Sequence, residues 1–466
     1  MGRTHLIIIQ LLQVNNFTIV ALFLQRSYQN YYLIQKHKMD LKIPSTGQKR
    51  VVIIGGGFGG IEIAKALKDQ DVQIVLLDKH NYHCFQPLLY QVATGGLEPG
   101  SIAYPLRKLM QNIPNGLFRL AEVRKIEPEK RSIHTDIGDL KYDHLIIATG
   151  STTNFFKFPK EVSDKMMQMK DIPQALNLRS FILENFEEAL LTYDESKKEE
   201  LINISIVGGG PTGVELAGAL GEMRKNILPK DYPEIDFRKM QIHLFESADR
   251  LLSTMHPDNS AKVLQYLKKF GVNVWLNTMV TDFDGDLLTT ADGKKIKCET
   301  VIWTAGVKGN AVNGLNQEAI VGGNRILIDE YCQVKGYENI YAIGDVAALV
   351  TEDTPRGHPM VAPVAIQQGA LVAKNIIAQM HNKTSKSFKY LDKGSMATVG
   401  RNKAVLEAKG VKMGGFIAWL AWLFVHMVSL IGFRNKITVT LGWIYNYFTY
   451  DRTLRLIIRP FKNKED

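Results

Sequence analysis

Residues 51–60 read Val-Val-Ile-Ile-Gly-Gly-Gly-Phe-Gly-Gly, and this segment indicates the fold of the residues on either side of it. The continuous run of β-branched residues is typical of a strand that is buried on both faces of a parallel sheet. A helical segment, IEIAKALK, follows the glycines, and a second strand, VQIVLLD, ends at Asp78. The order of strand, glycines, helix, strand and acid predicts a dinucleotide-binding unit.

The glycines at Gly55, Gly57 and Gly60 form the pattern G-x-G-x-x-G. We expect Gly55 to permit the tight turn, Gly57 to let the backbone approach a pyrophosphate, and Gly60 to let the helix pack on the strand. The start of the helix then faces the negative charge. Asp78, at the end of the second strand, is placed to accept hydrogen bonds from the hydroxyls of a ribose.

The same pattern recurs in the middle of the chain. The strand-like segment 202–207 leads into Gly208, Gly210 and Gly213, then into the helical sequence VELAGALGEM, and the strand QIHLFE ends at Glu246. Two such sites predict two dinucleotides, and because their reactive rings must meet, we expect one bound flavin and one transient nicotinamide. A carboxylate at the ribose position repels a 2′-phosphate, so Glu246 favours NADH over NADPH.

Shorter patterns indicate further contacts with the cofactors. The segments 142–150 and 298–306 read as strands that end at small residues, where the backbone passes close to a cofactor. Segment 339–345 reads as a strand that delivers Asp345, and 363–373 reads as a helix whose start faces a flavin. Each alone is also compatible with an ordinary strand-to-turn junction. Their order along the chain favours the cofactor sites.

The fold class predicted from these patterns is α/β, with two Rossmann-like domains and a C-terminal amphipathic-helix region that anchors the protein to a membrane. The expected divisions are an N-terminal extension over 1–48, the first part of an FAD-binding domain over 49–160, an NADH-binding domain over 161–310, the second part of the FAD-binding domain over 311–394, and a region for membrane association and dimerisation over 395–466.

Composition narrows the class of protein. The chain has 466 residues, of which 45% are hydrophobic and 22% charged, and this excludes a disordered or disulfide-stapled protein. The three cysteines, Cys84, Cys298 and Cys332, form no C-x-x-C pair and no metal-ligand cluster. We expect buried, reduced thiols in a reducing compartment and no metal site.

The basic residues are concentrated at the two ends of the chain. The net charge is +10, of which 1–38 carry +4 and 412–466 carry +5, so that 39–411 are nearly neutral. Both ends are also apolar. This distribution favours an anionic membrane surface as a partner and argues against nucleic acid.

The two apolar ends differ in how well each fits a membrane segment. Residues 6–24 are interrupted by polar side chains, and we expect 1–38 to be a disordered extension or an artefact of an upstream start, with Met39 as the native start. Residues 413–433 carry no formal charge, which meets the length rule for a transmembrane helix. An aromatic run over 439–450 and a basic tail follow, as suits helices that lie in the interface plane. A spanning helix and a buried core helix remain alternatives.

With these motifs in one order, residues 49–450 resemble the two-dinucleotide-binding-domain flavoproteins, and within them the type II NADH:quinone oxidoreductases. The most specific segments are NYHCFQPLLYQVATG over 81–95, GGGPTGVELAG over 208–218, and the tail GFIAWLAWLFVH with IGFRNK and NYFTYDR. The resemblance covers the whole chain after Met39.

The resemblance implies noncovalent FAD and a second site for NADH. The residues it assigns to FAD are Gly55, Gly57, Phe58, Gly59, Gly60, Asp78, Lys79, Gln86, Pro87, Thr149, Gly150, Asp345 and Ala365. Those it assigns to NADH are Gly208, Gly210, Gly213, Glu215, Glu246, Ala305 and Gly306. Glu215 would sit beside the nicotinamide and the flavin and couple hydride transfer to proton movement. The alternative for Glu215 is a carboxylate that complements the helix dipole.

The quinone-side motif departs from the family pattern, in which Ala-Gln precedes a second Gln. Here Ala362 is followed by Pro363, so we shift the quinone contact to Gln367 or Gln368, with an ordinary helix surface as the alternative. The backbone amide of Ala365 would face the pyrimidine end of the flavin, where negative charge develops.

The function implied is oxidation of NADH with reduction of a membrane quinone, without proton pumping, by a homodimer bound peripherally to the cytoplasmic face of the cell inner membrane. One alternative is a flavoprotein that senses NADH or uses another acceptor. The other is a sulfide:quinone oxidoreductase, which would need paired reactive cysteines such as Cys298 and Cys332. The absence of a cysteine pair after Gly60 argues against a thiol-disulfide reductase.

Overall fold

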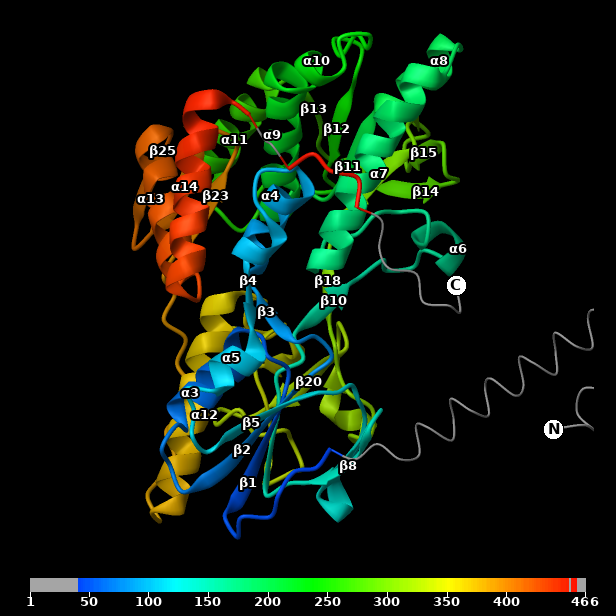
Figure 1. Cartoon of the computed structure of the whole chain (residues 1–466). Helices are drawn as coiled ribbons and strands as arrows, with labels where there is room; N and C mark the ends of the chain where they lie inside the picture. The colour runs from blue at the N-terminus through cyan, green and yellow to red at the C-terminus, as the bar shows by residue number, and fades with distance from the viewer. Residues whose placement is uncertain (1–40, 452–453, 459–466) are drawn as a thin grey trace, which may run out of the picture.

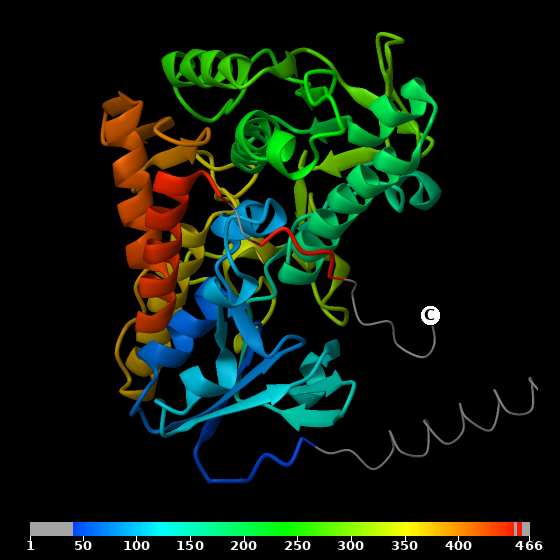
Figure 2. The same ribbon diagram turned by 45° about the horizontal axis from the view of Figure 1, so that its top comes forward.

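The computed structural model describes residues 41–451 and 454–458, and the predicted extension over 1–38 lies outside these residues. Two α/β units stand one above the other, and two C-terminal helices run along one side of them (Figure 1). The view in Figure 2 shows these two helices side by side at the edge of the molecule.

The lower unit is built on a five-stranded parallel sheet with the order β21-β9-β1-β2-β5. Its strands are β1 (Lys49–Ile54), β2 (Val72–Asp78), β5 (Gly116–Leu120), β9 (His144–Ile147) and β21 (Ile340–Ala342). Helix α3 (Phe58–Ala66) packs against the sheet and against α12 (Ala362–Met380). Because β1 lies between β2 and β9, its carboxyl end is the switch point at which such sheets bind ligands.

The upper unit repeats this arrangement with the strand order β13-β12-β11-β17. Its strands are β11 (Ile204–Val207), β12 (Ile242–Phe245), β13 (Val272–Trp275) and β17 (Thr300–Trp303), and its longer helices are α7 (Ile172–Leu191), α8 (Glu195–Ile202), α9 (Pro211–Asn226) and α11 (Pro257–Lys269). The second glycine loop follows β11, so it too lies at a switch point. The α/β fold with two similar nucleotide-binding units, predicted from the repeated motif, is therefore confirmed.

Smaller elements complete and connect the two units. The short strands are β3 (Tyr82–Cys84), β4 (Ala103–Pro105), β6 (Val123–Glu127), β7 (Ser132–Thr135), β8 (Gly138–Lys141), β10 (Ser151–Thr153), β14 (Val280–Phe283), β15 (Leu287–Thr290), β16 (Lys295–Lys297), β18 (Val307–Gly309), β19 (Ile320–Val321), β20 (Arg325–Ile328) and β22 (Ala347–Leu349). The short helices are α4 (Leu89–Ala93), α5 (Leu106–Met110), α6 (Lys160–Ser163) and α10 (Leu228–Asp231). Strand β10 follows β9 of the lower sheet, and β18 follows β17 of the upper sheet. The two pair antiparallel and so connect the two units.

The C-terminal region begins with a three-stranded antiparallel sheet, β23 (Ser395–Thr398), β24 (Ala404–Ala408) and β25 (Val411–Gly414), and continues with α13 (Phe416–Ser429) and α14 (Phe433–Thr449). The alternative of a spanning helix over 413–433 is not formed, because only Phe416–Ser429 of this segment are helical before α14 begins. Strand β25 takes the first residues of the segment, and Gly432, with a φ of 88°, makes the turn that separates the two helices. Fourteen helical residues span about 21 Å, which is less than the hydrocarbon core of a bilayer.

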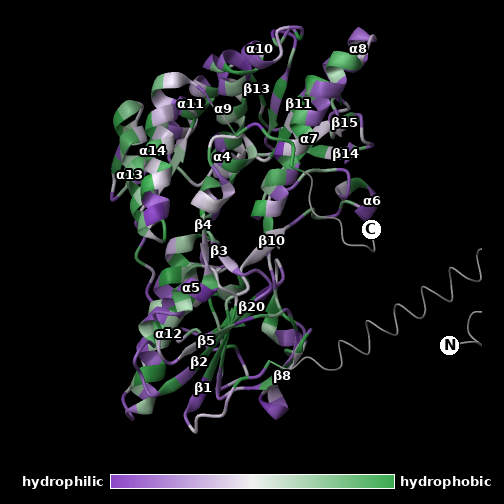
Figure 3. Ribbon diagram, in the orientation of Figure 1, coloured by the Kyte–Doolittle hydropathy of each residue, from purple (hydrophilic) through white to green (hydrophobic). Residues whose placement is uncertain are grey.

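Within the described part of the chain, none of the helices is both long enough and apolar enough to cross a membrane. Helices α13 and α14 instead present apolar side chains in two directions. Ala418 and Trp422 of α13 and Val439 of α14 are buried against the body of the protein. Large apolar side chains of both helices are exposed, and the hydropathy colours of Figure 3 mark α13 as largely hydrophobic. Those at least 40% exposed include Phe416, Ile417, Leu420, Phe424, Val428, Phe433, Ile437, Leu441, Ile444 and Phe448.

Candidate active site

The first glycine loop joins β1 to α3 at the switch point of the lower sheet. Gly55 has a φ of 107°, and a Cβ on it would collide with the Ala148 carbonyl, while a Cβ on Gly60 would collide with the Gly55 carbonyl. Around Gly57, in contrast, no described atom lies within 4 Å of the place of a Cβ. Gly55 is required by its positive φ and by close packing, and Gly60 is required by close packing alone. Gly57 instead faces open space that a ligand can approach.

Asp78 at the end of β2 is fixed against this loop. Its Oδ2 accepts a hydrogen bond from the Gly56 amide at 2.6 Å, and its Oδ1 accepts one from the His80 amide at 2.7 Å. Asp78 remains partly exposed, and Lys79 beside it is exposed. Asp78 therefore lies below the turn, and its carboxylate can accept a further hydrogen bond from a donor such as a ribose hydroxyl.

His83 on β3 lies on the other side of the same loop. Its Nδ1 lies 3.1 Å from the Gly56 carbonyl oxygen, and burial lowers its pKa to about 4, so the ring is neutral and Nδ1 carries the proton. Its buried Nε2 is then an acceptor, and it has no hydrogen-bond partner among the described residues. Sequence reasoning did not select His83, although it lies within the NYHCFQP segment.

The start of α3 supplies donors to the same space. Its N-cap is Gly57, and no described side chain caps this end of the helix. The first amides of the helix are therefore available to an anion, and the helix dipole favours one. A purely structural turn has no need of uncapped amides, open space at Gly57 or an unpaired acceptor on His83. A bound dinucleotide would use all three.

Other segments converge on the carboxyl ends of β9 and β21. Ser151 donates to the Asp345 carboxylate at 2.5 Å, and Thr149 donates to the Asn310 carbonyl at 2.6 Å. Gly150, with a φ of 68°, again has no described atom within 4 Å of the place of a Cβ. The residues predicted from the two strand ends are thus neighbours in space, although about 195 residues separate Thr149 from Asp345 in the sequence.

The segment after β3 brings aromatic rings from three parts of the chain together. The ring of Phe85 is buried, and it packs edge-on against Phe58 of the glycine loop at 5.8 Å and against His426 of α13 at 6.0 Å. Gln86, which precedes Pro87, donates to the Lys170 carbonyl at 3.3 Å. The glycine loop and the C-terminal helix are therefore connected through one buried ring.

Helix α12 begins near this point, and Pro363 fits its first turn, where no amide donor is required. Gln368 is buried, and its Oε1 accepts a hydrogen bond from the Gly344 amide at 2.7 Å, next to Asp345. Gln367 makes two hydrogen bonds to the backbone of Leu391, at 2.9 and 3.0 Å. The Ala365 amide makes a long bond of 3.4 Å to the Val361 carbonyl. These bonds give both glutamines structural partners, and a quinone contact of either remains a prediction.

The second glycine loop has the same construction as the first. Gly208, with a φ of 113°, lies against the backbone of Ala305, Gly213 lies against the Gly208 carbonyl, and Gly210 faces open space. Glu246 accepts hydrogen bonds from the Gly209 amide at 2.7 Å and the Ala248 amide at 2.8 Å. Gly306, beyond Ala305, lies against the Phe156 ring. The loop, Glu246 and the end of β17 thus lie together, as the sequence pattern predicts.

Glu215 lies on α9, shortly after this loop, and is 7% exposed. Its Oε1 accepts a hydrogen bond from the Thr398 amide of β23 at 3.3 Å. Burial raises the pKa of Glu215 to about 8, while the Thr398 amide and the Trp422 indole act to lower it. The carboxyl group is therefore turned into the protein and does not serve the helix dipole at the surface. It changes its charge close to neutral pH.

Trp422 of α13 faces the Glu215 carboxyl group from the C-terminal region. It is 1% exposed, and its ring stacks on His426 at 3.9 Å. Its Nε1 completes no hydrogen bond of regular geometry to a described residue. His426 contacts the Trp422 carbonyl through Nδ1 at 2.8 Å, and burial lowers its pKa to about 4. The uncharged rings of Trp422 and His426 thus cover Glu215, which is the buried acid of α9.

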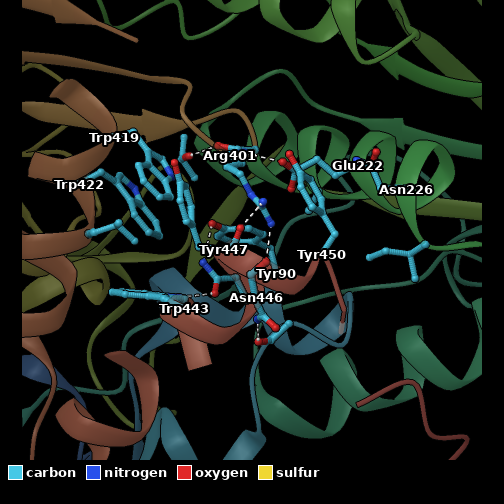
Figure 4. A pocket seen from close by; sticks show the side chains of 17 residues that line it. Tyr90, Glu222, Asn226, Arg401, Trp419, Trp422, Trp443, Asn446, Tyr447 and Tyr450 are labelled. Atoms are coloured by element: carbon cyan, nitrogen blue, oxygen red, sulfur yellow. Dashed lines mark hydrogen bonds between the residues drawn. The ribbon is translucent and has the colours of Figure 1, made fainter. Parts of the chain in front are cut away.

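A cavity of about 100 Å³ adjoins this cluster (Figure 4). It lies between α4, α9 and the two C-terminal helices, and its wall includes Tyr90, Trp419, Trp422, Trp443 and Tyr447. Arg401 crosses it. The Arg401 amide donates to Glu222 of α9 at 2.6 Å, and its guanidinium donates to the Tyr447 carbonyl at 2.6 Å and also to the Asn446 carbonyl.

The Arg401 guanidinium also lies 3.5 Å from the centroid of the Tyr450 ring. Arg401 therefore caps the end of α14 and ties it to α9. The sequence analysis did not select Arg401, because nothing in its local pattern indicates which helix end lies above it.

The cysteines are far from forming a redox pair. Cys298 and Cys332 are buried and Cys84 is partly buried, and all three are free. Burial raises the pKa of the Cys84 and Cys298 thiols to about 12, and it raises that of Cys332 still further. Thiols held protonated in this way are poor nucleophiles, which argues against a sulfide-oxidising site.

Two family models match the chain. The model described as pyridine nucleotide-disulphide oxidoreductase matches residues 49–369, and the model described as NDH2 C-terminal domain matches residues 393–450. Together they cover both nucleotide units and the C-terminal strands and helices.

Curated relatives match over most of the chain. The type II NADH:quinone oxidoreductase NdhA of Mycobacterium tuberculosis is 37% identical over 415 residues, which are 85% of this chain and 87% of that protein. A type II NADH:quinone oxidoreductase of Haemophilus influenzae is 34% identical over 77% of this chain and 86% of its own length.

Solved structures share the fold at lower identity. NDH2 from Plasmodium falciparum in complex with NADH has a TM-score of 0.80 at 21% identity and covers 88% of this chain and 100% of its own. The sulfide:quinone oxidoreductase of Aquifex aeolicus has a TM-score of 0.68 at 20% identity and covers 86% of this chain and 95% of its own. At these identities the likeness concerns the fold alone.

Proposed function

The chain belongs to the type II NADH:quinone oxidoreductases, and we propose that it oxidises NADH through noncovalently bound FAD and reduces a membrane quinone without pumping protons. The observation that carries this proposal is the position of Glu215. It is a buried acid that follows the second glycine loop on α9 and is covered by aromatic groups of the helix that bears the exposed apolar face.

The lower site suits FAD. The open faces of Gly57 and Gly150, the uncapped start of α3 and the unpaired Nε2 of His83 leave room and hydrogen-bonding groups for a dinucleotide. Asp78 would accept from a ribose hydroxyl, and Asp345 would accept from the polyol chain. A flavin held by these residues would supply the acceptor for the hydride of NADH and the donor of two electrons to the quinone.

The upper site suits NADH. Gly210 leaves space for the pyrophosphate at the start of α9, and Glu246 stands where the ribose hydroxyls would lie. Because Glu246 already accepts hydrogen bonds from the Gly209 and Ala248 amides, its carboxylate is fixed in position and repels a phosphate at the 2′ position. We therefore infer a preference for NADH over NADPH.

Glu215 would hold the proton that accompanies the reaction. With a pKa of about 8, its carboxyl group is mostly protonated at neutral pH, and an oxygen of that group can release or regain a proton without a large cost. The single backbone donor from Thr398 stabilises the ionised form only in part. We assign Glu215 the coupling of electron transfer to proton movement.

The exposed apolar faces of α13 and α14 would lie in the membrane interface, on the cytoplasmic face of the inner membrane, and part of them would be shared with a second copy in a homodimer. Interface helices of this kind bring a lipid-soluble quinone close to Phe85 and His426 without a spanning segment.

The proposal is tested by mixing the detergent-purified protein with NADH and following the absorbance in the flavin band. Rapid bleaching, followed by recovery on addition of a short-chain quinone, is expected. Bleaching without quinone-dependent recovery would contradict quinone reduction and favour another acceptor or a sensor. A protein with no flavin absorbance would contradict the lower site.

A further inference from the structure

An open depression of about 450 Å³ lies at the turn between α13 and α14. It is lined by residues 428–433 and by two lysines, Lys65 of α3 and Lys436 of α14. Lys65 is exposed and lies in the last turn of α3. The depression therefore joins a helix of the lower nucleotide-binding unit to the C-terminal helix pair, at the lower end of that pair in Figure 1.

The lining carries positive charge and no acid among the described residues. Lys436 Nζ donates one hydrogen bond to the Val428 carbonyl at 2.8 Å, which fixes the ammonium group at the wall and leaves two N–H donors for a ligand. Arg434, next in α14, is also exposed. Two ammonium groups from separate helices thus face one space that lacks a counter-ion from its own wall.

The start of α14 adds to this positive field. Gly432 is its N-cap, no described side chain caps it, and both Gly432 and Phe433 line the depression. The free amides and the helix dipole favour an anion at that point, in addition to the two lysines.

The rim of the depression is apolar. Phe433 is 79% exposed and Val428 is 49% exposed, and both belong to the apolar faces that α13 and α14 turn outward. A small hydrated anion would make no use of this rim. An anion that carries hydrocarbon chains would satisfy the lysines and the rim together.

We propose that this depression binds the phosphate of an anionic membrane phospholipid, with Lys65 and Lys436 on the phosphate oxygens and the acyl chains beside Val428 and Phe433. The inference rests on the proposed membrane association and deepens it. Lys65 belongs to α3 of the lower unit, so a lipid bound to it would fix the orientation of that unit relative to the bilayer. Apolar contacts of α13 and α14 alone would not set this orientation.

The test is sedimentation of the full-length protein with vesicles of phosphatidylcholine alone or with one-third phosphatidylglycerol, over a series of salt concentrations. The double variant K65Q/K436Q is expected to bind phosphatidylglycerol vesicles about tenfold or more weakly, since each basic residue near such a surface contributes about fivefold. Its binding to phosphatidylcholine vesicles and its turnover with NADH and a short-chain quinone in detergent should be unchanged.

The matched control is K268Q/K269Q, which removes two exposed positive charges from the end of α11. It is expected to lose less than threefold. An equal loss in both double variants would overturn the proposal, because it would show a diffuse charge effect. Inorganic phosphate provides the other arm. If it binds the wild-type protein with submillimolar affinity in calorimetry, and K65Q/K436Q abolishes that binding without changing vesicle binding, the site is one for free phosphate and the lipid proposal fails.

Failure of this site is distinguishable from failure of the membrane proposal. The variant I417S/F424S changes two exposed apolar residues of α13 outside the depression. If it releases the protein from both kinds of vesicle while K65Q/K436Q has no effect, the membrane association stands and the lipid site is wrong. If the wild-type protein binds neither kind of vesicle, both proposals fail.

Discussion

Glu215 of α9 and Trp422 of α13 meet in the interior of the protein, although one helix follows the second glycine loop and the other bears an exposed apolar face. The contact places an ionisable group of the nucleotide-binding unit under a side chain of the region that we assign to the membrane interface.

Replacement of Glu215 by Gln keeps the shape of the side chain and removes its proton exchange. We expect turnover with NADH and quinone to fall by about a hundredfold, in the range found for general acid–base groups, while the flavin content stays within 20% of wild type. Turnover and absorbance are measured on the same sample. The control is E222Q on the same helix, which should leave turnover within about threefold. Unchanged turnover in E215Q would remove the proposed proton role.

The Trp422→Phe variant keeps an aromatic ring against His426 and removes the indole N–H. Because that indole acts to lower the pKa of Glu215, its loss should raise the pKa further, and the pH profile of turnover should move about one unit toward alkaline pH. W419F, on the same helix, is the control and should not move the profile. A drop in turnover at every pH with no shift would indicate only a packing role for Trp422.

The pH dependence of stability gives an independent check on Glu215. Its folded pKa of about 8 lies above the unfolded value, so between about pH 4.5 and 8 the folded state binds more protons than the unfolded state. The contribution of Glu215 to stability is complete below that range and is lost as the pH rises through it. The melting temperature of wild type should therefore fall more between pH 6 and 9 than that of E215Q. Parallel curves would contradict the raised pKa.

The two nucleotide units were predictable because each is encoded by a short, contiguous pattern. The strand, the three glycines, the helix and the terminal acid span residues 49–78 in the first unit and 204–246 in the second, and the local geometry of Gly55 or Gly208 leaves little choice of residue. The order of the motifs then placed Asp345 beside the end of β9, since parallel strands of one sheet end at the same edge.

The parts that sequence reasoning missed depend on contacts between distant segments. The alternative of a spanning helix over 413–433 stayed open in the sequence because apolar composition does not show where β25 ends or where Gly432 turns the chain against Tyr104 of β4. Arg401 was missed because its partners, Glu222 and the end of α14, lie about 180 residues before it and 45 residues after it. The side-chain amide of Gln367 bonds the backbone of Leu391, which lies 24 residues further along the chain, and no sequence pattern predicts this pairing.

Glu246 should determine the choice of dinucleotide. We expect the E246A variant to reduce the ratio of kcat/KM for NADH over NADPH by about tenfold or more, because removal of the carboxylate relieves repulsion of a 2′-phosphate. The carboxylate also accepts hydrogen bonds from the Gly209 and Ala248 amides, so E246Q serves as the control that keeps an acceptor there. An unchanged ratio in both variants would show that another group reads the ribose.

Arg401 should stabilise the C-terminal helix pair. Its guanidinium serves two carbonyls at the end of α14 and the ring of Tyr450, and a lysine can satisfy only part of this arrangement. We expect R401Q to lower the free energy of unfolding by about 2–3 kcal/mol and R401K by less. Thermal unfolding of the detergent-bound protein measures both. Equal melting temperatures for wild type and R401Q would contradict the capping role.

The outward faces of α13 and α14 should be required for membrane binding and dispensable for folding. Replacing Ile417 and Phe424 by Ser removes apolar surface that already faces solvent, so the melting temperature should change by less than that of a variant in the buried face, such as A418S. Membrane binding should weaken by about tenfold or more, because each large apolar side chain moved out of an interface costs about 1–2 kcal/mol. Flotation of the two variants with native-like vesicles measures the difference. If I417S/F424S floats like wild type, the exposed face serves an interface between protein chains, and the oligomeric state of that variant in detergent would then be reduced.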